Sequence, residues 1–128
     1  MANPNNNGTY VGKVLKKPIF VHNREGIDFQ ARWTLCVRRD YKNRKGEYDY
    51  DFIPMRLYGD ESRLKIARRL EEKDVIIVTG CTVTESYDTK NGRKFNMYIR
   101  VEKINFPPRT SYNPETVIRE ETDFLPFG

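Results

Sequence analysis

The segment Asp28-Phe29-Gln30-Ala31-Arg32-Trp33-Thr34-Leu35-Cys36-Val37-Arg38 alternates apolar and polar side chains along its whole length. An alternation of period two is typical of a β-strand that has one face in a core. The odd-numbered residues from Phe29 to Val37 are therefore predicted to face the core. The even-numbered residues from Gln30 to Arg38 are predicted to form a polar, basic outer face.

Four further segments show the same alternation, and one amphipathic helix divides the series. We predict strands over 9–15, 51–58, 75–87 and 94–104, and a helix that follows a cap at Asp60 or Ser62 and ends near Lys73. Asn91-Gly92 is a strong hairpin-turn signal, and Gly12 indicates a bulge or a close backbone approach. Five strands with a helix between the third and the fourth is the order of an OB-fold barrel. The predicted fold is therefore an all-β, five-stranded OB-fold barrel.

Composition excludes several classes of protein. The 128 residues are enough for one domain with appendages. No apolar run approaches the length of a membrane span, and the first residues lack the pattern of a secretory signal. Cys36 and Cys81 lie in separate apolar runs, which indicates buried thiols in a reducing cytosol. We therefore expect a soluble, cytoplasmic protein.

Candidate catalytic or metal-binding groups are isolated from one another. His22 has no cysteine or carboxylate at ligand spacing. Asp49 and Asp51 lack a partner base, and we interpret them as solvated loop charges. Ser62 and Ser86 have no base at a recognisable spacing. We therefore expect no enzymatic activity, no cofactor and no metal.

Aromatic residues on the predicted outer face are accompanied by cations. In the 51–58 strand the odd-numbered side chains already supply the core, so Phe52 and Tyr58 face outwards beside Arg56. Tyr41 lies in a basic loop over 39–49, and Tyr87 lies at the base of the second hairpin. Single-stranded nucleic acid needs this combination, because cations neutralise phosphates and flat rings stack on unpaired bases.

The predicted site therefore has two sets of residues. The predicted stacking residues are Tyr41, Phe52, Tyr58 and Tyr87. The predicted phosphate-binding residues are Arg32, Arg38, Arg39, Lys42, Arg44, Lys45, Arg56, Lys90, Arg93 and Lys94. The alternative is that these rings pack in a subunit interface, because exposed aromatic residues often mark protein contacts.

The C-terminal segment Glu120-Glu121-Thr122-Asp123-Phe124-Leu125-Pro126-Phe127-Gly128 has the opposite charge to the rest of the chain. The whole chain carries +5, whereas residues 115–128 contain four acidic residues and one arginine. An acidic, apolar tail on a basic body predicts a polyanion as one partner and a protein as the other. The predicted organisation is a flexible 1–8, a binding domain over 9–106, a linker over 107–114 and a disordered acidic tail over 115–128.

The chain resembles the bacterial single-stranded DNA-binding proteins over about residues 9–106 and in the tail. The residues that carry the resemblance are Tyr10-Val11-Gly12-Lys13-Val14, Ala31-Arg32-Trp33-Thr34-Leu35, Leu57-Tyr58-Gly59, Ile77-Val78-Thr79-Gly80, Tyr87 and Gly92. In that family, aromatic residues that stack on DNA map onto Tyr41, Phe52, Tyr58 and Tyr87. The resemblance also implies a homotetramer, with a dimer possible, and a bacterial, nucleoid-associated location.

The resemblance implies a further role for the tail, which in the family docks replication, recombination and repair proteins. The residues to which this partner-binding role would pass are Asp123, Phe124, Leu125, Pro126 and Phe127. The chain departs from the family pattern in three ways. Phe or Tyr replaces the tryptophans at stacking positions, the linker is short, and Gly128 follows Phe127, so the terminal carboxylate is one residue further out.

Three functional hypotheses follow. The first is a sequence-independent protein that coats single-stranded DNA and recruits replication and repair proteins through its tail. The second is an OB-fold accessory protein of the primosomal or conjugation type, which acts mainly as a protein adaptor. The third, a small nuclease, is disfavoured because the sequence shows no set of metal-binding carboxylates and no nucleophile constellation.

Overall fold

A computed structural model describes residues 3–108 and contains six strands and one helix. In chain order the elements are β1 (Gly8–Val14), β2 (Ile19–His22), β3 (Asp28–Lys42), β4 (Tyr48–Tyr58), α1 (Glu61–Arg68), β5 (Val75–Thr89) and β6 (Gly92–Asn105). The predicted acidic tail and most of the predicted linker lie outside the described residues. No helix among the described residues is both long enough and apolar enough to cross a membrane.

Five of the strands close into a barrel in the order β1-β5-β6-β4-β3. Antiparallel pairs join β1 to β5, β5 to β6 and β4 to β3, and a short parallel pair joins β4 to β6. The barrel closes where Lys13 and Val14 of β1 pair with Cys36 and Leu35 of β3. The helix lies between β4 and β5, that is, between the third and fourth strands of the barrel. The predicted five-stranded barrel with one helix is therefore confirmed.

The sixth strand, β2, was not predicted. It pairs with β3 from Ile19↔Arg32 to His22↔Asp28 and contains a register shift after Val21. Four residues are too few to establish an alternating pattern, so the strand exists only through its pairing with β3. The helix is also shorter than predicted. Asp60 caps it by accepting a hydrogen bond from the Arg63 backbone N–H, and it ends at Arg68.

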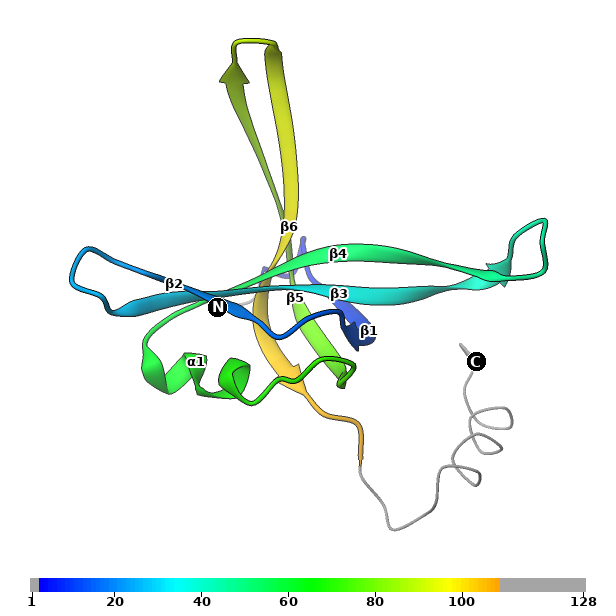
Figure 1. Cartoon of the computed structure of the whole chain (residues 1–128), viewed down its shortest axis with the longest axis horizontal. Coiled ribbons are helices and arrows are strands. Elements are labelled where there is room, and N and C mark those ends of the chain that lie inside the picture. The colour runs from blue at the N-terminus through cyan, green and yellow to red at the C-terminus, as the bar shows by residue number, and fades with distance from the viewer. Residues whose placement is uncertain (1–2, 109–128) are drawn as a thin grey trace.

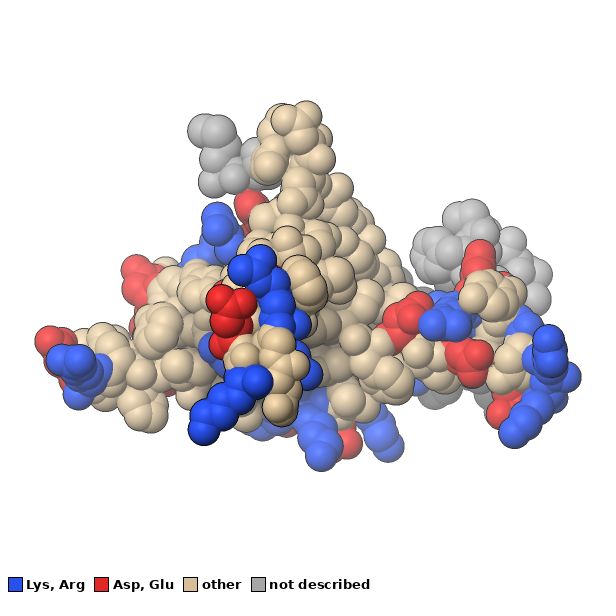
Figure 2. Space-filling view, turned by 90° about the horizontal axis from the view of Figure 1, so that it is seen from above, with Lys and Arg blue, Asp and Glu red and all other residues tan. Residues whose placement is uncertain are grey.

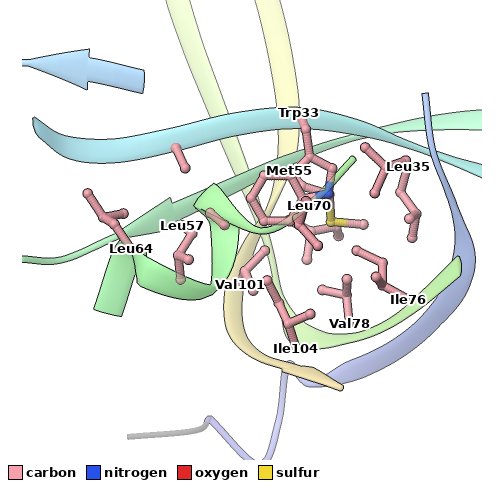
Figure 3. Close-up of a cluster of buried hydrophobic side chains, with 14 residues drawn as sticks. Trp33, Leu35, Met55, Leu57, Leu64, Leu70, Ile76, Val78, Val101 and Ile104 are labelled. Carbon is pink, nitrogen blue, oxygen red and sulfur yellow. The ribbon is translucent and has the colours of Figure 1, made fainter. Parts of the chain in front are cut away.

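The core lies inside the barrel and under the helix. Figure 3 shows Trp33, Leu35 and Met55 of the strands gathered with Leu64 and Leu70 from the helical side. All five side chains are at most 6% exposed. Removing this much apolar surface from water is the main favourable term for a domain of this size.

Three side chains on the apolar faces of the alternating strands are exposed, among them Phe29, which was predicted to face the core. Phe29 is 40%, Phe95 is 78% and Met97 is 45% exposed. Phe95 and Met97 follow the same alternation as the buried Ile99 and Val101, but they lie on the projecting part of the β5–β6 hairpin, where the barrel no longer covers them (Figure 1). Periodicity reports which face a residue takes, whereas burial depends on what lies opposite that face.

Two glycines allow strands to approach closely. A Cβ at Gly12 would meet the Cys36 backbone oxygen, at the point where β1 closes the barrel against β3. A Cβ at Gly80 would meet the Arg100 backbone oxygen, beside the register shift between β5 and β6. The predicted close approach at Gly12 is therefore confirmed.

Three hairpins project from the barrel in different directions. Figure 1 shows the β5–β6 hairpin standing upright, the β3–β4 hairpin extending to the right and the β2–β3 hairpin extending to the left. The far ends of β3 and β4, from Arg38 to Phe52, are called the β3–β4 arm below. This arm extends strand structure into the 39–49 segment that was predicted to be a loop.

Candidate nucleic-acid interface

One continuous outer face runs across β3 and β4. Residues directly opposite each other on paired strands share a face, and the register pairs Cys36 with Phe52, Arg32 with Arg56 and Gln30 with Tyr58. Gln30 is the exception in burial, because it is only 2% exposed and accepts a hydrogen bond from Arg32 Nε. The structure therefore places Phe52, Arg56, Tyr58 and Arg32 on one face, as the alternation predicted.

A row of aromatic side chains follows the outer face of β4 along the arm. Tyr48, Tyr50 and Phe52 alternate with acidic residues and are 36%, 47% and 60% exposed. Tyr48 lies in the basic segment predicted to be a loop but was not in the predicted stacking set, and Tyr50 was missed because the strand was predicted to begin at residue 51. The signal was present in the sequence, since aromatic residues at 48, 50 and 52 already have the period of a strand.

Two cations from β3 lie over the first ring of this row. The Arg38 guanidinium carbon is 4.4 Å and the Lys42 ammonium nitrogen is 5.7 Å from the centre of the Tyr48 ring. Arg44 and Lys45 lie in the exposed turn beyond, where Asn43 Oδ1 accepts hydrogen bonds from the Lys45 and Glu47 backbone N–H groups. Figure 2 shows Lys and Arg side chains gathered at the end of this arm.

Tyr41 and Arg39 lie on the other side of the arm. Arg39 Nη2 is 2.9 Å from Asp51 Oδ1, and alternation points Asp51 away from Phe52. The hydrogen bond to Asp51 and the charge of Asp51 raise the pKa of Arg39, and the nearby Tyr41 raises it further. The hydrogen bond from Arg39 in turn lowers the pKa of Asp51. Asp51 is therefore an ion-pair partner rather than a solvated charge, and Tyr41, 58% exposed, is not next to Phe52.

Arg56 and Tyr58 form a compact group with two residues of the β5–β6 sheet. The Arg56 guanidinium carbon lies 3.9 Å from the centre of the Tyr98 ring, and its Nη1 lies 3.4 Å from Glu85 Oε1. Burial acts to raise the pKa of Tyr58, but hydrogen bonding to Arg56 and Tyr98 outweighs it, so the pKa is lowered. Burial and the neighbouring Tyr58 raise the pKa of Tyr98.

The β5–β6 hairpin divides its predicted site residues between two faces. Tyr87 is paired with Lys94, and it shares a face with Glu85, which contacts Arg56 on the outer face. Arg93 is paired with Asp88, with its Nε 3.2 Å from Asp88 Oδ1, on the opposite face. Lys90 lies in the two-residue turn at the tip. Tyr87 and Lys94 thus extend the outer face, whereas Arg93 does not.

Two lysines border the outer face and were missed. A hollow of about 370 Å³ lies between the 15–19 segment and the outer face of β3 and β4, and Lys16, Lys17, Arg32 and Arg56 line it. Lys17 is partly engaged, because its Nζ is 2.8 Å from Glu71 Oε1. The direction in which Lys16 and Lys17 point could not be predicted, since both residues follow the predicted 9–15 strand and belong to none.

The described residues contain no group of three or more His, Cys, Asp or Glu side chains that could hold a metal ion. The outer face of β3 and β4 presents cations, aromatic rings and hydrogen-bonding groups. Such a face can bind a flexible polyanion that carries flat bases.

No protein-family model matches the chain. It is similar to the single-stranded DNA-binding protein of Halalkalibacterium halodurans, with 30% identity over 103 residues that cover 79% of this chain and 60% of that protein. Single-stranded DNA-binding protein 1 of Clostridium acetobutylicum is 25% identical over 97 residues, which cover 75% of this chain and 87% of the relative. The chain thus spans less than two thirds of the first of these relatives and most of the second.

Solved structures show the same fold at low sequence identity. The small single-stranded DNA-binding protein of Streptomyces coelicolor gives a TM-score of 0.60 at 16% identity, over 79% of this chain and 93% of that one. The Plasmodium falciparum SSB in complex with ssDNA gives a TM-score of 0.66 at 18% identity, over 80% and 95%.

Proposed function

The chain belongs to the family of single-stranded DNA-binding proteins, and from that premise we propose that it binds single-stranded DNA on the outer face of β3 and β4. The observation that carries the proposal is the aromatic row Tyr48, Tyr50 and Phe52, exposed on the same face as Arg38 and Arg56. Rings of this kind stack on successive bases whatever their identity. Binding is therefore independent of sequence, and the protein coats the strand.

The cations along the path bind the phosphates. Arg32, Arg38, Lys42 and Arg56 lie on the outer face of the two strands, Arg44 and Lys45 lie at the end of the arm, and Lys94 lies beside Tyr87. Arg39 and Arg93 lie on the other faces of their hairpins, and Lys90 lies at the tip of the β5–β6 hairpin, so these three cations bind phosphates only where the DNA passes around a hairpin. Neutralising phosphates releases counterions, so affinity falls steeply as salt rises.

Tyr41 enters the proposal as a ring at the edge of the arm. Single-stranded DNA that passes around the end of the arm from the Phe52 face reaches the exposed Tyr41 side chain. Tyr87 extends the path in the other direction, onto the β5–β6 hairpin. The four predicted stacking residues thus mark the length of the path rather than a single cluster.

The tail and the assembly complete the proposal. Residues 9–106 act as the DNA-binding domain of a cytoplasmic homo-oligomer, and the acidic residues and Phe-Leu-Pro-Phe of the C-terminal segment recruit replication, recombination and repair proteins. Deleting residues 120–128 is expected to leave DNA affinity unchanged or slightly raised, since an acidic segment competes with DNA for cations. A large loss of affinity would instead place the tail in the DNA site.

Titration of labelled oligo-dT and oligo-rU at several salt concentrations tests the function. We expect tight binding of oligo-dT whose logarithmic affinity falls linearly with the logarithm of the salt concentration. Failure to bind either oligomer, in a protein shown to be folded, would overturn the proposal and favour an adaptor protein.

A further inference from the structure

A second hollow, of about 390 Å³, opens where the end of β4 meets β6 and the start of the helix. Its lining residues are Tyr58, Arg63, Tyr98, Arg100, Val101 and Glu102. The volume lies within the range of small-molecule sites, which is about 300–1,000 Å³. Only Tyr58 of this set belongs to the predicted DNA path, so the sequence assigned no role to the hollow as such.

Arg63 gives the hollow a fixed wall. Its Nε donates to the Tyr58 carbonyl oxygen at 2.9 Å, and its Nη2 donates to the carbonyl oxygens of Val101 and Glu102 at 3.1 Å. These bonds tie the helix to the ends of β4 and β6. A guanidinium engaged in this way is a structural group, but its charge still favours an anion nearby.

Two tyrosines form the aromatic side of the hollow. Tyr98 is 7% exposed, and the Arg56 guanidinium carbon lies 3.9 Å from the centre of its ring. Tyr58 is partly exposed and lies between the hollow and the outer face. A base that follows the aromatic row along β4 as far as Tyr58 therefore meets a second aromatic side chain inside the hollow.

Arg100 is the uncommitted cation of the hollow. It is paired with Arg56 across the parallel β4–β6 ladder, so both side chains lie on the outer face. Arg56 has a carboxylate partner in Glu85, whereas Arg100 is exposed and makes no salt bridge within residues 3–108. Two adjacent cations with only one carboxylate partner favour an anion between them or beside them.

We propose that this hollow holds one nucleotide of the bound strand, with the base against Tyr58 and Tyr98 and the phosphate on Arg100. The inference rests on the proposed DNA-binding function and extends it. It adds a pocket at the β4–β6 junction to the stacked row along the arm, and it makes Arg100 a phosphate ligand that the sequence-based set did not include. The path of the DNA then turns off β4 at Tyr58 instead of ending there.

The test compares two variants that each remove one positive charge from β6. Arg100→Ala removes the proposed ligand, and Lys103→Ala removes an exposed cation that does not line the hollow. Binding of oligo-dT is measured for both variants and for the wild type over a range of salt concentrations. We expect Arg100→Ala to weaken binding about 5- to 30-fold and to lower the salt slope by about 0.7, the value for one phosphate on a single strand. Lys103→Ala should change the affinity less than about 2-fold.

Equal effects of the two variants would overturn the pocket, because Arg100 would then act only through net charge. Arg100→Lys should restore part of the lost affinity, since it keeps the charge but loses the planar fork. Phe52→Ala, on the arm, distinguishes failure of the nucleotide site in the hollow from failure of the proposed DNA binding on β3 and β4. If the wild type binds oligo-dT and Phe52→Ala weakens that binding while Arg100→Ala does not, only the nucleotide site in the hollow is contradicted. A wild type that binds no oligo-dT sinks the proposed function itself.

Discussion

The central carbon of the Arg56 guanidinium lies 3.9 Å from the centre of the Tyr98 ring, and its Nη1 lies 3.4 Å from Glu85 Oε1. An arginine side chain held by an aromatic ring and a carboxylate already has little rotamer freedom before DNA binds. Binding a phosphate therefore costs less side-chain entropy than it does for a free surface lysine. Tyr58, which we propose as a stacking ring, is hydrogen-bonded to this arginine and to Tyr98.

The lowered pKa of Tyr58 predicts a pH dependence of DNA binding. Its phenol has an ordinary pKa of 10.0 and ionises at a lower pH here. Below that pH the ring is neutral, whereas above it a phenolate repels the phosphates, so affinity should fall as the pH rises towards 10. Tyr58→Phe should lack this part of the fall. Titrations at a series of alkaline pH values check it, and identical profiles for the variant and the wild type would contradict it.

Phe52 and Phe95 offer a matched pair of exposed rings on opposite faces. They are 60% and 78% exposed, and both lie on strands of projecting hairpins. Phe52→Ala should weaken oligo-dT binding by about 1–3 kcal/mol, the contribution of one stacked base. Phe95→Ala should leave the affinity unchanged, because this ring faces away from the outer face. Equal losses would show that the strand does not distinguish the two faces.

Substitutions of Tyr50 and Tyr41 test how single-stranded DNA passes along the arm. Tyr50 lies in the outer row between Tyr48 and Phe52, and Tyr41 lies on the side of Arg39. Tyr50→Ala should cost about 1–3 kcal/mol of binding free energy, and Tyr41→Ala should cost as much only with oligomers long enough to pass around the arm. Fluorescence titrations with short and long oligo-dT measure both. A loss for Tyr41→Ala with the shortest oligomer would place Tyr41 in the row itself.

Gly80→Ala tests the close contact between β5 and β6. The added Cβ would meet the Arg100 backbone oxygen, which belongs to a paired strand and cannot move alone. We expect the free energy of unfolding in urea to fall by about 1–3 kcal/mol. Thr84→Ala, further along β5 and exposed, is the control and should change it by less than about 0.5 kcal/mol. A variant as stable as the wild type would mean that the strands adjust freely at this point.

The strand alternation predicted the barrel, the helix and the outward facing of Phe52 and Tyr58 correctly, because each of these follows from local pattern. The pattern did not show where the barrel stops covering a strand, so it does not distinguish the exposed Phe95 and Met97 from the buried Ile99 and Val101. The predicted strand also began too late, at residue 51: Tyr48 and Tyr50 have the period of β4, but the charged residues beside them resemble a loop.

Contacts between distant segments were the second gap. The ion pair of Arg39 with Asp51, twelve residues away in the sequence, was not predicted, and the role of Arg39 at phosphates stays a prediction. Arg100 was passed over because its setting depends on the parallel pairing of β4 with β6, which joins residues 56 and 100. The pattern of a single sequence predicts which face of a strand a side chain lies on and where turns occur. The ion-pair partner of each charged side chain depends on how the distant strands pair in the closed barrel.

Photo-crosslinking locates single-stranded DNA on the protein and so tests whether it lies on the outer face of β3 and β4. An oligo-dT in which single thymines are replaced by 5-iodouracil crosslinks to aromatic rings stacked on that base, and mass spectrometry of the digested protein identifies them. The account predicts crosslinks at Tyr50, Phe52 and Tyr58, which lie on one face of β4. Crosslinks confined to Phe95 or Phe29, with none on β4, would contradict it.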